Sequence, residues 1–193
     1  MKYYEQEKNV EVYIEMAKGY DGRELITELK KYLPRNSSVL EIGMGPGTDL
    51  LILEKYYKDQ GHVTGSDYSK IFIDRYRKQH PDSHLIVLNA ITLKTDQKFQ
   101  GLYSNKVLIH LTREELKQSI KRQADILEPE GIICHSFWRG AKEENYDGLL
   151  FIYYTENQIQ KLFEDSFDII KIEKYQEMEP DDSLFIIARK ASK

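Results

Sequence analysis

Cysteine is almost absent from the sequence, since Cys134 is the only one among 193 residues. A disulfide within the chain is therefore excluded, and the apolar neighbours of Cys134 in GIICHSF predict a buried structural residue. Apolar runs of the length that a membrane helix needs are also absent. The first residues, MKYYEQEKNVEVY, lack the apolar segment of a secretory signal, so we expect a cytoplasmic location.

Long stretches of one charge sign are missing as well. The 28 basic and 32 acidic residues give a net charge of −4 and are interleaved, as in LTREELKQSIKRQ. Because affinity for nucleic acids depends on concentrated basic residues that neutralise phosphates, this distribution argues against DNA or a large RNA as substrate. The length and the globular composition predict one domain over residues 1–193.

Residues with the spacing of metal ligands are not found either. The side chains considered as ligands, those of Cys134, His62, His80, His84 and His135, do not have the spacing of a metal site. We therefore expect no structural or catalytic metal.

What the sequence does contain is a regular alternation of β-favouring apolar runs with helical periodicity. Strands are predicted over residues 37–43, 62–67, 84–90, 101–109 and 132–138, with helices between them. Such alternation implies a parallel sheet with right-handed crossovers and helices on both faces. Two further strands, 167–175 and 183–190, flank the turn-rich EMEPDD and predict a terminal antiparallel pair.

Local signals mark several helix ends. Capping boxes at Thr112 and Thr155 predict the starts of two helices, and Ser69 is predicted to cap a third. Gly61 is predicted to end the helix that follows the first strand. The segment 139–148 is predicted to be a polar connection that lies over a site.

The segment VLEIGMGPGTDL, residues 39–50, carries the strongest functional signal. An apolar strand runs directly into Gly43, Gly45 and Gly47, and a helix is predicted to begin at once, so that the backbone approaches a ligand closely beside a helix N-terminus. Asp67 follows about 20 residues later, where a carboxylate accepts hydrogen bonds from both ribose hydroxyls. The loop and the acid together predict an adenosine-containing cofactor.

The spacing of the glycines distinguishes between such cofactors. Dinucleotide sites use G-x-G-x-x-G, which places a pyrophosphate at the helix N-terminus. Here Gly43, Gly45 and Gly47 alternate, and Glu41 stands two residues before the first. A carboxylate at that position opposes a pyrophosphate and attracts a cationic ligand. These residues favour S-adenosylmethionine as the cofactor. A nicotinamide-dependent reductase is the less favoured alternative.

From residue 37 to residue 190 the order of these signals resembles the class I S-adenosylmethionine-dependent methyltransferases. VLEIGMGPG resembles the first motif of that family, GSDYS its acidic second strand, LNA its adenine-contacting step, and GLYSNKVLIHL and LEPEGIICHSF its fourth and fifth strands. The resemblance implies a Rossmann-like α/β fold: a doubly wound, mostly parallel seven-stranded sheet with helices on both faces and a C-terminal antiparallel strand. It also implies S-adenosylmethionine as cofactor and an N-terminal helical lid segment over residues 1–34.

The same resemblance implies a set of cofactor-contacting residues near the strand ends. They are Glu41, Gly43, Met44, Gly45, Gly47, Asp67, Tyr68, Asn89, Ala90, Ser104, Asn105 and Tyr20. Asn89 stands where the family often has aspartate, and its amide oxygen is able to accept a hydrogen bond from the adenine amino group. Ser104-Asn105-Lys106 lacks the two prolines and the aromatic residue of the amino-directed nucleic-acid methyltransferases. A DNA base is therefore not expected as the acceptor.

Two residues are candidates for catalysis, although positioning alone can supply much of the acceleration of methyl transfer. His110 is able to act as a base because imidazole titrates near neutral pH, but its place in VLIHLT favours a packed, hydrogen-bonded side chain. Lys106 is a candidate for binding an acidic substrate, with a solvated strand-end lysine as the alternative. A dense set of aromatic residues is able to form a wall near the acceptor: Trp138, Tyr146, Phe151, Tyr153 and Tyr154.

The chain carries little beyond the core fold with which to bind a macromolecule. We therefore predict a methyltransferase that acts on an O, N or other nucleophilic atom of a small-molecule acceptor by in-line displacement. The alternatives are methylation of a protein or RNA, and a non-catalytic cofactor-binding or regulatory domain. Gly19 and Gly22 flank Tyr20 and Asp21, which permits a hinge in the lid segment.

Overall fold

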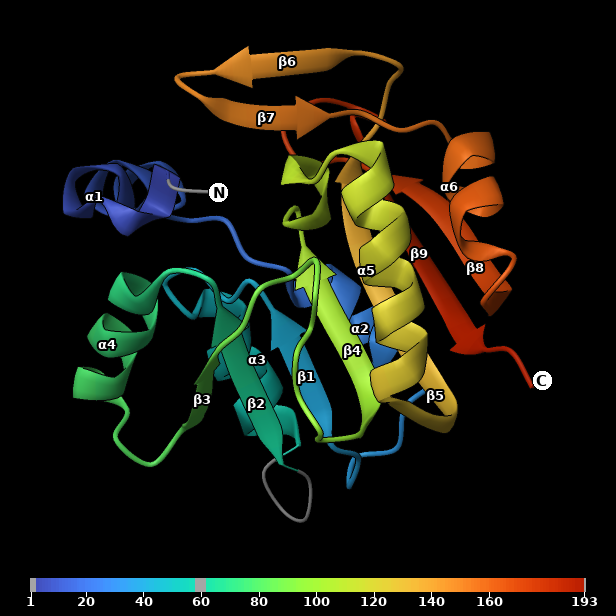
Figure 1. Cartoon of the computed structure of the whole chain (residues 1–193), viewed down its shortest axis with the longest axis horizontal. Helices are drawn as coiled ribbons and strands as arrows, with labels where there is room; N and C mark the ends of the chain where they lie inside the picture. Colours follow the sequence, from blue (N-terminus) through green and yellow to red (C-terminus); the bar gives the residue numbers. More distant parts are fainter. Residues whose placement is uncertain (1–2, 58–61, 193) are drawn as a thin grey trace.

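The computed structural model describes residues 3–57 and 62–192. Most of its strands belong to one sheet, which lies at the centre of the molecule (Figure 1). The strands of this sheet are β1 (Val39–Ile42), β2 (Val63–Asp67), β3 (His84–Val87), β4 (Phe99–Asn105), β5 (Leu127–Trp138), β8 (Phe167–Tyr175) and β9 (Ser183–Lys190). Over the described residues the sheet has seven strands in the order β3-β2-β1-β4-β5-β9-β8.

The pairing directions confirm the predicted topology. Strands β3, β2, β1, β4 and β5 are parallel neighbours, whereas β9 is antiparallel to both β5 and β8. The chain proceeds outward from β1 on one side and then returns to pair β4 against its other edge. This reversal of strand order opens a crevice at the carboxyl ends of β1 and β4, where ligands bind in doubly wound folds.

Helices cover both faces of the sheet, as predicted. Their bounds are α1 (Glu7–Met16), α2 (Arg23–Leu29), α3 (Thr48–Tyr56), α4 (Lys70–Gln79), α5 (Arg113–Ile126) and α6 (Glu156–Phe163), with short 3-10 helices η1 (Tyr3–Glu5) and η2 (Leu108–His110). Side chains of α5 and α6 share one buried apolar cluster, and those of α2, α3 and α4 share the other. Burial on both faces explains why β1 is apolar almost throughout. Within the described part of the chain, no helix combines the length and apolar character that crossing a membrane requires.

A β-hairpin replaces the polar connection predicted after β5. Strand β6 (Glu143–Tyr146) pairs antiparallel with β7 (Leu149–Ile152) in a separate sheet. The segment is polar, as predicted, but it is not an irregular connection, because Asp147 and Gly148, both with positive φ, form the two-residue turn that suits a twisted hairpin. The hairpin lies beyond the carboxyl ends of the parallel strands, at the same end of the sheet as α1 (Figure 1).

Other predicted boundaries shift for local reasons. Strand β4 stops at Asn105 because Lys106 has a φ of 55°, and η2 follows where a strand was predicted. Ser69 occupies the N-cap position of α4, but its hydroxyl donates to the carbonyl of Tyr4 instead of capping the helix. Gly61 and residues 1–2 of the predicted lid lie outside the described residues.

The capping box of α5 is confirmed and gives a stability prediction. Thr112 Oγ1 accepts from the Glu115 backbone N–H at 3.3 Å, and the Glu115 carboxylate accepts from the Thr112 N–H at 2.8 Å. Thr112→Ala is expected to lower the free energy of unfolding by about 1 kcal/mol, and the melting temperature by roughly 2–4 °C. Thermal denaturation followed by circular dichroism measures this, with Thr112→Ser as the control that retains the cap. Equal melting of the alanine and serine variants would contradict the assignment.

Candidate active site

The glycine loop after β1 has the backbone that only glycine adopts readily. Gly43, Gly45 and Gly47 have φ values of 73°, 50° and 86°. A Cβ added at Gly43 would lie 2.5 Å from a Val107 methyl group, and one added at Gly47 would lie 2.2 Å from the Tyr76 ring. The loop therefore packs closely on its neighbours and leaves its backbone open toward the crevice.

Asp67, at the end of β2, is tied to this loop. Its carboxylate accepts from the backbone N–H of Gly45 at 2.9 Å and from that of Ser69 at 2.8 Å. Burial raises the pKa of Asp67 to about 6, against the lowering effect of these backbone hydrogen bonds. Each carboxylate oxygen has two acceptor sites, so both retain capacity for a ribose hydroxyl.

Glu41, on β1, is a buried carboxylate whose hydrogen-bonding capacity is not filled. The residue is 3% exposed, and Oε2 has no hydrogen-bond partner among the described residues. Burial, and then the nearby Asp49 and Asp67, hold the pKa of Glu41 well above its ordinary range. Since Glu41 also lines the larger cavity described next, its free oxygen is placed to receive a cationic or hydrogen-bond-donating ligand.

Two adjoining cavities lie at this edge of the sheet. The smaller, about 70 Å³, is bordered by Asp67 and by Leu88 and Ala90, which follow β3. The larger, about 510 Å³, extends from Glu41 under the β6–β7 hairpin. Their linings share six residues, namely Tyr3, Tyr4, Tyr13, Gly43, Lys106 and His110. The two cavities are thus parts of one site.

Aromatic rings of the N-terminal segment cover the loop side of this site. Tyr4 packs against Tyr13 with ring centroids 5.4 Å apart, and both contact Phe72 of α4. The Tyr13 ring lies 3.3 Å from where a Cβ of Gly45 would be. Burial raises the pKa of Tyr13 to about 12, so its hydroxyl stays protonated. The segment predicted as a lid therefore lies directly over the glycine loop.

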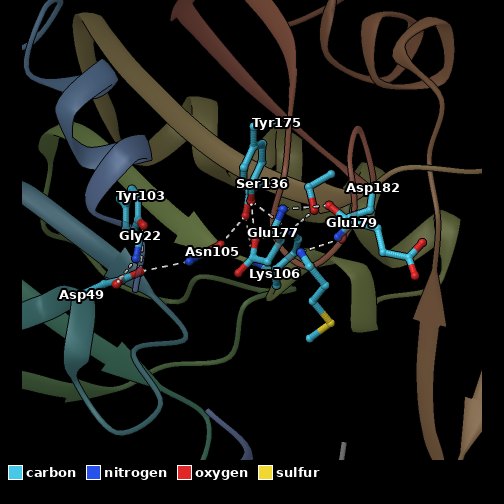
Figure 2. Close-up of polar contacts among 12 residues, drawn as sticks. Gly22, Asp49, Tyr103, Asn105, Lys106, Ser136, Tyr175, Glu177, Glu179 and Asp182 are labelled. Atoms are coloured by element: carbon cyan, nitrogen blue, oxygen red, sulfur yellow. Dashed lines mark hydrogen bonds and ion pairs between the residues drawn. The ribbon is translucent and has the colours of Figure 1, made fainter. Parts of the chain in front are cut away.

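A polar network fixes the connection between α1 and α2 to the end of β4 (Figure 2). The Asp49 carboxylate accepts from the backbone N–H of Gly22 at 2.6 Å, from the Tyr103 hydroxyl at 2.7 Å and from the Asn105 amide at 3.2 Å. Burial raises the pKa of Asp49, and these three donors oppose that shift. The network holds Asn105 at the cavity edge.

Lys106 is the centre of a second group of contacts (Figure 2). Its Nζ donates to the Tyr175 hydroxyl at 2.9 Å, to a Glu177 carboxylate oxygen at 2.8 Å and to the Ser183 hydroxyl at 2.8 Å. It also lies 4.0 Å from the centre of the Trp138 ring. Burial lowers the pKa of Lys106, while Glu177 opposes the shift. An ammonium has three N–H donors, and all three are used here.

This arrangement predicts a stabilising role for Lys106. Its side chain and that of Glu177 are 13% and 14% exposed. Lys106→Met leaves the Glu177 carboxylate buried without its cation, so the free energy of unfolding is expected to fall by about 3 kcal/mol. Urea denaturation measures the change.

The matched control for this prediction is Lys142→Met. Lys142 pairs with Glu144 at 2.7 Å, with side chains that are 58% and 48% exposed. Its loss is expected to lower the free energy of unfolding far less than Lys106→Met does, because solvent screens the pair. Equal losses in the two variants would show that burial of the Lys106 pair has no energetic consequence.

His110, on η2, lines both cavities. Its Nδ1 lies 2.7 Å from the carbonyl oxygen of Leu150 on β7, and its ring packs edge-on against Phe151 with centroids 4.8 Å apart. A carbonyl only accepts, so Nδ1 carries the proton and Nε2 keeps its lone pair. Burial lowers the pKa of His110, and Nε2 has no hydrogen-bond partner among the described residues. His110 is thus both packed, as the motif suggested, and equipped with a free basic nitrogen.

The structure brings most of the predicted cofactor residues together. The lining of the two cavities contains Glu41, Gly43, Met44, Gly45, Asp67, Tyr68, Ala90, Asn105 and Tyr20. Gly47 is not in either described lining, but it forms part of the glycine loop that borders the site. Ser104 is buried against His135 at 2.8 Å, and the Asn89 amide oxygen accepts from the backbone N–H groups of Ile91 and Thr92. The described cavity linings include neither Ser104 nor Asn89, and their contacts with the cofactor stay predictions.

The aromatic wall forms in part. Trp138, Tyr146 and Phe151 line the larger cavity, whereas Tyr154 is fully buried against Phe137 and Tyr153 bonds to Glu144. Sequence interpretation missed three groups of residues: Tyr4 with Phe72, Asp49, and Glu177 with Met178. Asp49 directly precedes the apolar run Leu50-Leu51-Ile52-Leu53 in the first turn of α3, which is the one signal that could have drawn attention to it. Glu177 and Met178 have no local signal.

No group of three or more histidine, cysteine, aspartate or glutamate residues in the described ranges is arranged to hold a metal ion. The expectation that the protein needs no metal stays a prediction.

The strand order, with β9 antiparallel in an otherwise parallel sheet, is that of the class I methyltransferase fold. Solved structures with this fold include 1,6-didemethyltoxoflavin-N1-methyltransferase from Burkholderia thailandensis with its acceptor and S-adenosylhomocysteine (TM-score 0.76, 18% identity, 88% of this chain and 78% of that chain). They also include the N-methyltransferase NodS from Bradyrhizobium japonicum WM9 with S-adenosylhomocysteine (TM-score 0.70, 17% identity, 88% of this chain and 87% of that chain). A third is PH0226 from Pyrococcus horikoshii OT3 (TM-score 0.73, 19% identity, 98% of this chain and 95% of that chain).

The sequence is also similar to known methyltransferases. Residues 39–131 match the family described as "Methyltransferase domain". The phosphoethanolamine N-methyltransferase of Plasmodium falciparum is 22% identical over 147 residues, which are 74% of this chain and 52% of that relative, so the chain spans about half of the relative's length. Residues 39–131 are therefore similar to a methyltransferase domain, which confirms the predicted resemblance to the class I S-adenosylmethionine-dependent methyltransferases, and the solved structures confirm the Rossmann-like fold.

Proposed function

We propose that the chain transfers the methyl group of S-adenosylmethionine to a small-molecule acceptor. The observation that carries this proposal is the unpartnered, buried Oε2 of Glu41, which borders the same site as the glycine loop and Asp67. A cationic amino-acid group satisfies the free oxygen, and a ribose satisfies Asp67. The chemistry of the donor set therefore fits this cofactor.

Each part of the cofactor has residues suited to hold it. Asp67 would accept from the ribose hydroxyls, and Gly43 and Gly45 would let the nucleoside lie against the backbone. Leu88 and Ala90 would border the adenine, and Glu41 would receive the methionine ammonium.

The residues around the larger cavity would organise the transfer. When bound, S-adenosylmethionine supplies an electrophilic methyl carbon: the acceptor lone pair forms the new bond to it, the carbon–sulfur bond breaks toward sulfur, and S-adenosylhomocysteine results. His110 would take the acceptor's proton on Nε2, because Nδ1 is held by the Leu150 carbonyl. Asn105 and Trp138 would keep the acceptor in line, and positioning supplies much of the acceleration.

The size and charge of the larger cavity support a small acceptor that lacks phosphate. Its volume of about 510 Å³ lies within the range of about 300–1,000 Å³ that is usual for small-molecule sites. The parasite relative is named for phosphoethanolamine. Among the described lining residues, Lys106 is the one lysine or arginine, and its three donors are occupied. A phosphate would find no free cation there.

Calorimetric titration with S-adenosylhomocysteine, and with NAD in parallel, tests the proposal. Saturable binding of S-adenosylhomocysteine without binding of NAD is expected. Binding of NAD alone, or of neither ligand, would contradict the methyltransferase function.

A further inference from the structure

Exposed apolar side chains surround the mouth of the larger cavity. Seven large apolar side chains are exposed among the described residues, and five of them line this one cavity: Val12, Met16, Tyr20, Tyr146 and Met178. We call these five the apolar rim. They come from α1, the connection after it, the hairpin tip and the loop between β8 and β9. Exposed apolar surface gathered at one opening marks a site that binds an apolar group.

The charged groups of the same cavity are mostly acidic. Its described lining contains four carboxylates, those of Asp21, Glu41, Asp49 and Glu177, and one ammonium, that of Lys106. Because the ammonium already donates to three protein oxygens, it has no N–H left for an anionic acceptor. Since Glu177 pairs with Lys106 and Glu41 would receive the methionine ammonium, Asp21 and Asp49 are the charged groups of the described lining that remain. A carboxylate or phosphate entering here therefore finds no cation to pair with, whereas an amine meets a favourable field.

Resting on the proposed methyltransferase function, we propose that the acceptor is an amine carried on an apolar body that contains at least one ring. The apolar rim and Phe151 contact the body, and the amine nitrogen reaches the floor near His110, which lies between the two cavities. An acceptor that enters as an ammonium first loses one proton to solvent. The nitrogen lone pair then forms the bond to the methyl carbon, the carbon–sulfur electron pair stays on sulfur, and Nε2 of His110 takes a proton from nitrogen.

Binding to the protein saturated with S-adenosylhomocysteine tests the acceptor class by calorimetry. The probes are tryptamine, indole-3-acetate, which has the same ring system with a carboxylate, and ethanolamine, which is an amine without an apolar body. Tryptamine is expected to bind at least tenfold more tightly than either of the other two. Equal binding of indole-3-acetate would overturn the charge argument, and equal binding of ethanolamine would overturn the need for an apolar body.

Rim variants test where the apolar body binds. Tyr146 and Met178 are 74% and 60% exposed, so the double variant Tyr146→Ser/Met178→Ser changes surface positions and leaves the core intact. It is expected to weaken tryptamine binding about tenfold through lost apolar contact. The matched control is Val87→Ser, since Val87 is 54% exposed on β3 and outside the cavity lining.

Titration with S-adenosylhomocysteine separates the two levels of the proposal. Its affinity is expected to be the same in the unmodified protein, the rim variant and the Val87 control. Loss of this binding in the unmodified protein would overturn the methyltransferase function itself. Retained binding together with unchanged tryptamine affinity in the rim variant would overturn the acceptor class alone.

Discussion

Replacing Asp67 by alanine is expected to weaken the binding of S-adenosylhomocysteine at least a hundredfold. The carboxylate would accept from two ribose hydroxyls, and hydrogen bonds to a charged group contribute about 1.5–3 kcal/mol each. Alanine also removes the acceptor for the Gly45 N–H, so the glycine loop loses one of its fixed contacts. Calorimetry gives the affinity, and thermal denaturation verifies that the variant remains folded.

The affinity should also depend on pH with a definite sign. Because burial raises the pKa of Asp67 to about 6, the carboxyl is protonated below that pH and accepts fewer hydrogen bonds. Binding of S-adenosylhomocysteine is therefore expected to weaken as the pH falls through about 6, and Asp67→Asn should remove this dependence. For folding the sign is opposite: a raised carboxyl pKa contributes stability at low pH, and this contribution is lost as the pH rises through about 6.

Asp74→Ala is the matched control for Asp67→Ala. Asp74 lies on α4, where it pairs with Lys70 and is 41% exposed. Its replacement should leave cofactor affinity unchanged. An Asp67→Ala variant that binds S-adenosylhomocysteine as tightly as the unmodified protein would remove Asp67 from the cofactor site.

His110→Gln is expected to lower kcat by a factor of about 10²–10⁴, the usual contribution of a general base, while cofactor affinity stays unchanged. Glutamine retains a donor for the Leu150 carbonyl but offers no basic nitrogen to the acceptor. Single-turnover transfer from S-adenosylmethionine to whichever acceptor the enzyme turns over measures the chemical step. Calorimetry with S-adenosylhomocysteine measures the binding.

The pH profile distinguishes a base from a packing residue. Burial lowers the pKa of His110, so Nε2 becomes unprotonated at a lower pH than in an ordinary histidine. In the unmodified protein, the rate of methyl transfer should rise as the pH increases through that lowered pKa. In His110→Gln this rise should be absent. A variant that melts earlier but keeps the same pH profile would show that His110 only packs.

The elements nearest the glycine loop were predictable because their signals are local. Alternating glycines with positive φ, an acid at the end of the second strand and a capping box each depend on a few neighbouring residues. The hairpin after β5 had a local signal too, since Asp147-Gly148 is a two-residue turn sequence. It was missed because the flanking residues 139–146 are mostly polar, and strand β6 is exposed throughout.

The contacts of Lys106 could not be predicted from the sequence. Its partners Tyr175, Glu177 and Ser183 lie about 70 residues away and meet it only through the antiparallel placement of β8 and β9. Likewise, no pattern around Tyr4 shows that its ring would meet Phe72. Long-range pairing is set by the register of strands and the packing of helices, which short motifs do not encode.

The chain has a single tryptophan, Trp138, and the fold places it in the larger cavity beneath the Lys106 ammonium. Its fluorescence, excited at wavelengths where the 14 tyrosines do not absorb, therefore originates from this one location. A compound that stacks near the indole or displaces the ammonium changes the emission without any label. The protein thus contains its own optical reporter, which permits libraries of candidate acceptors to be screened by direct titration.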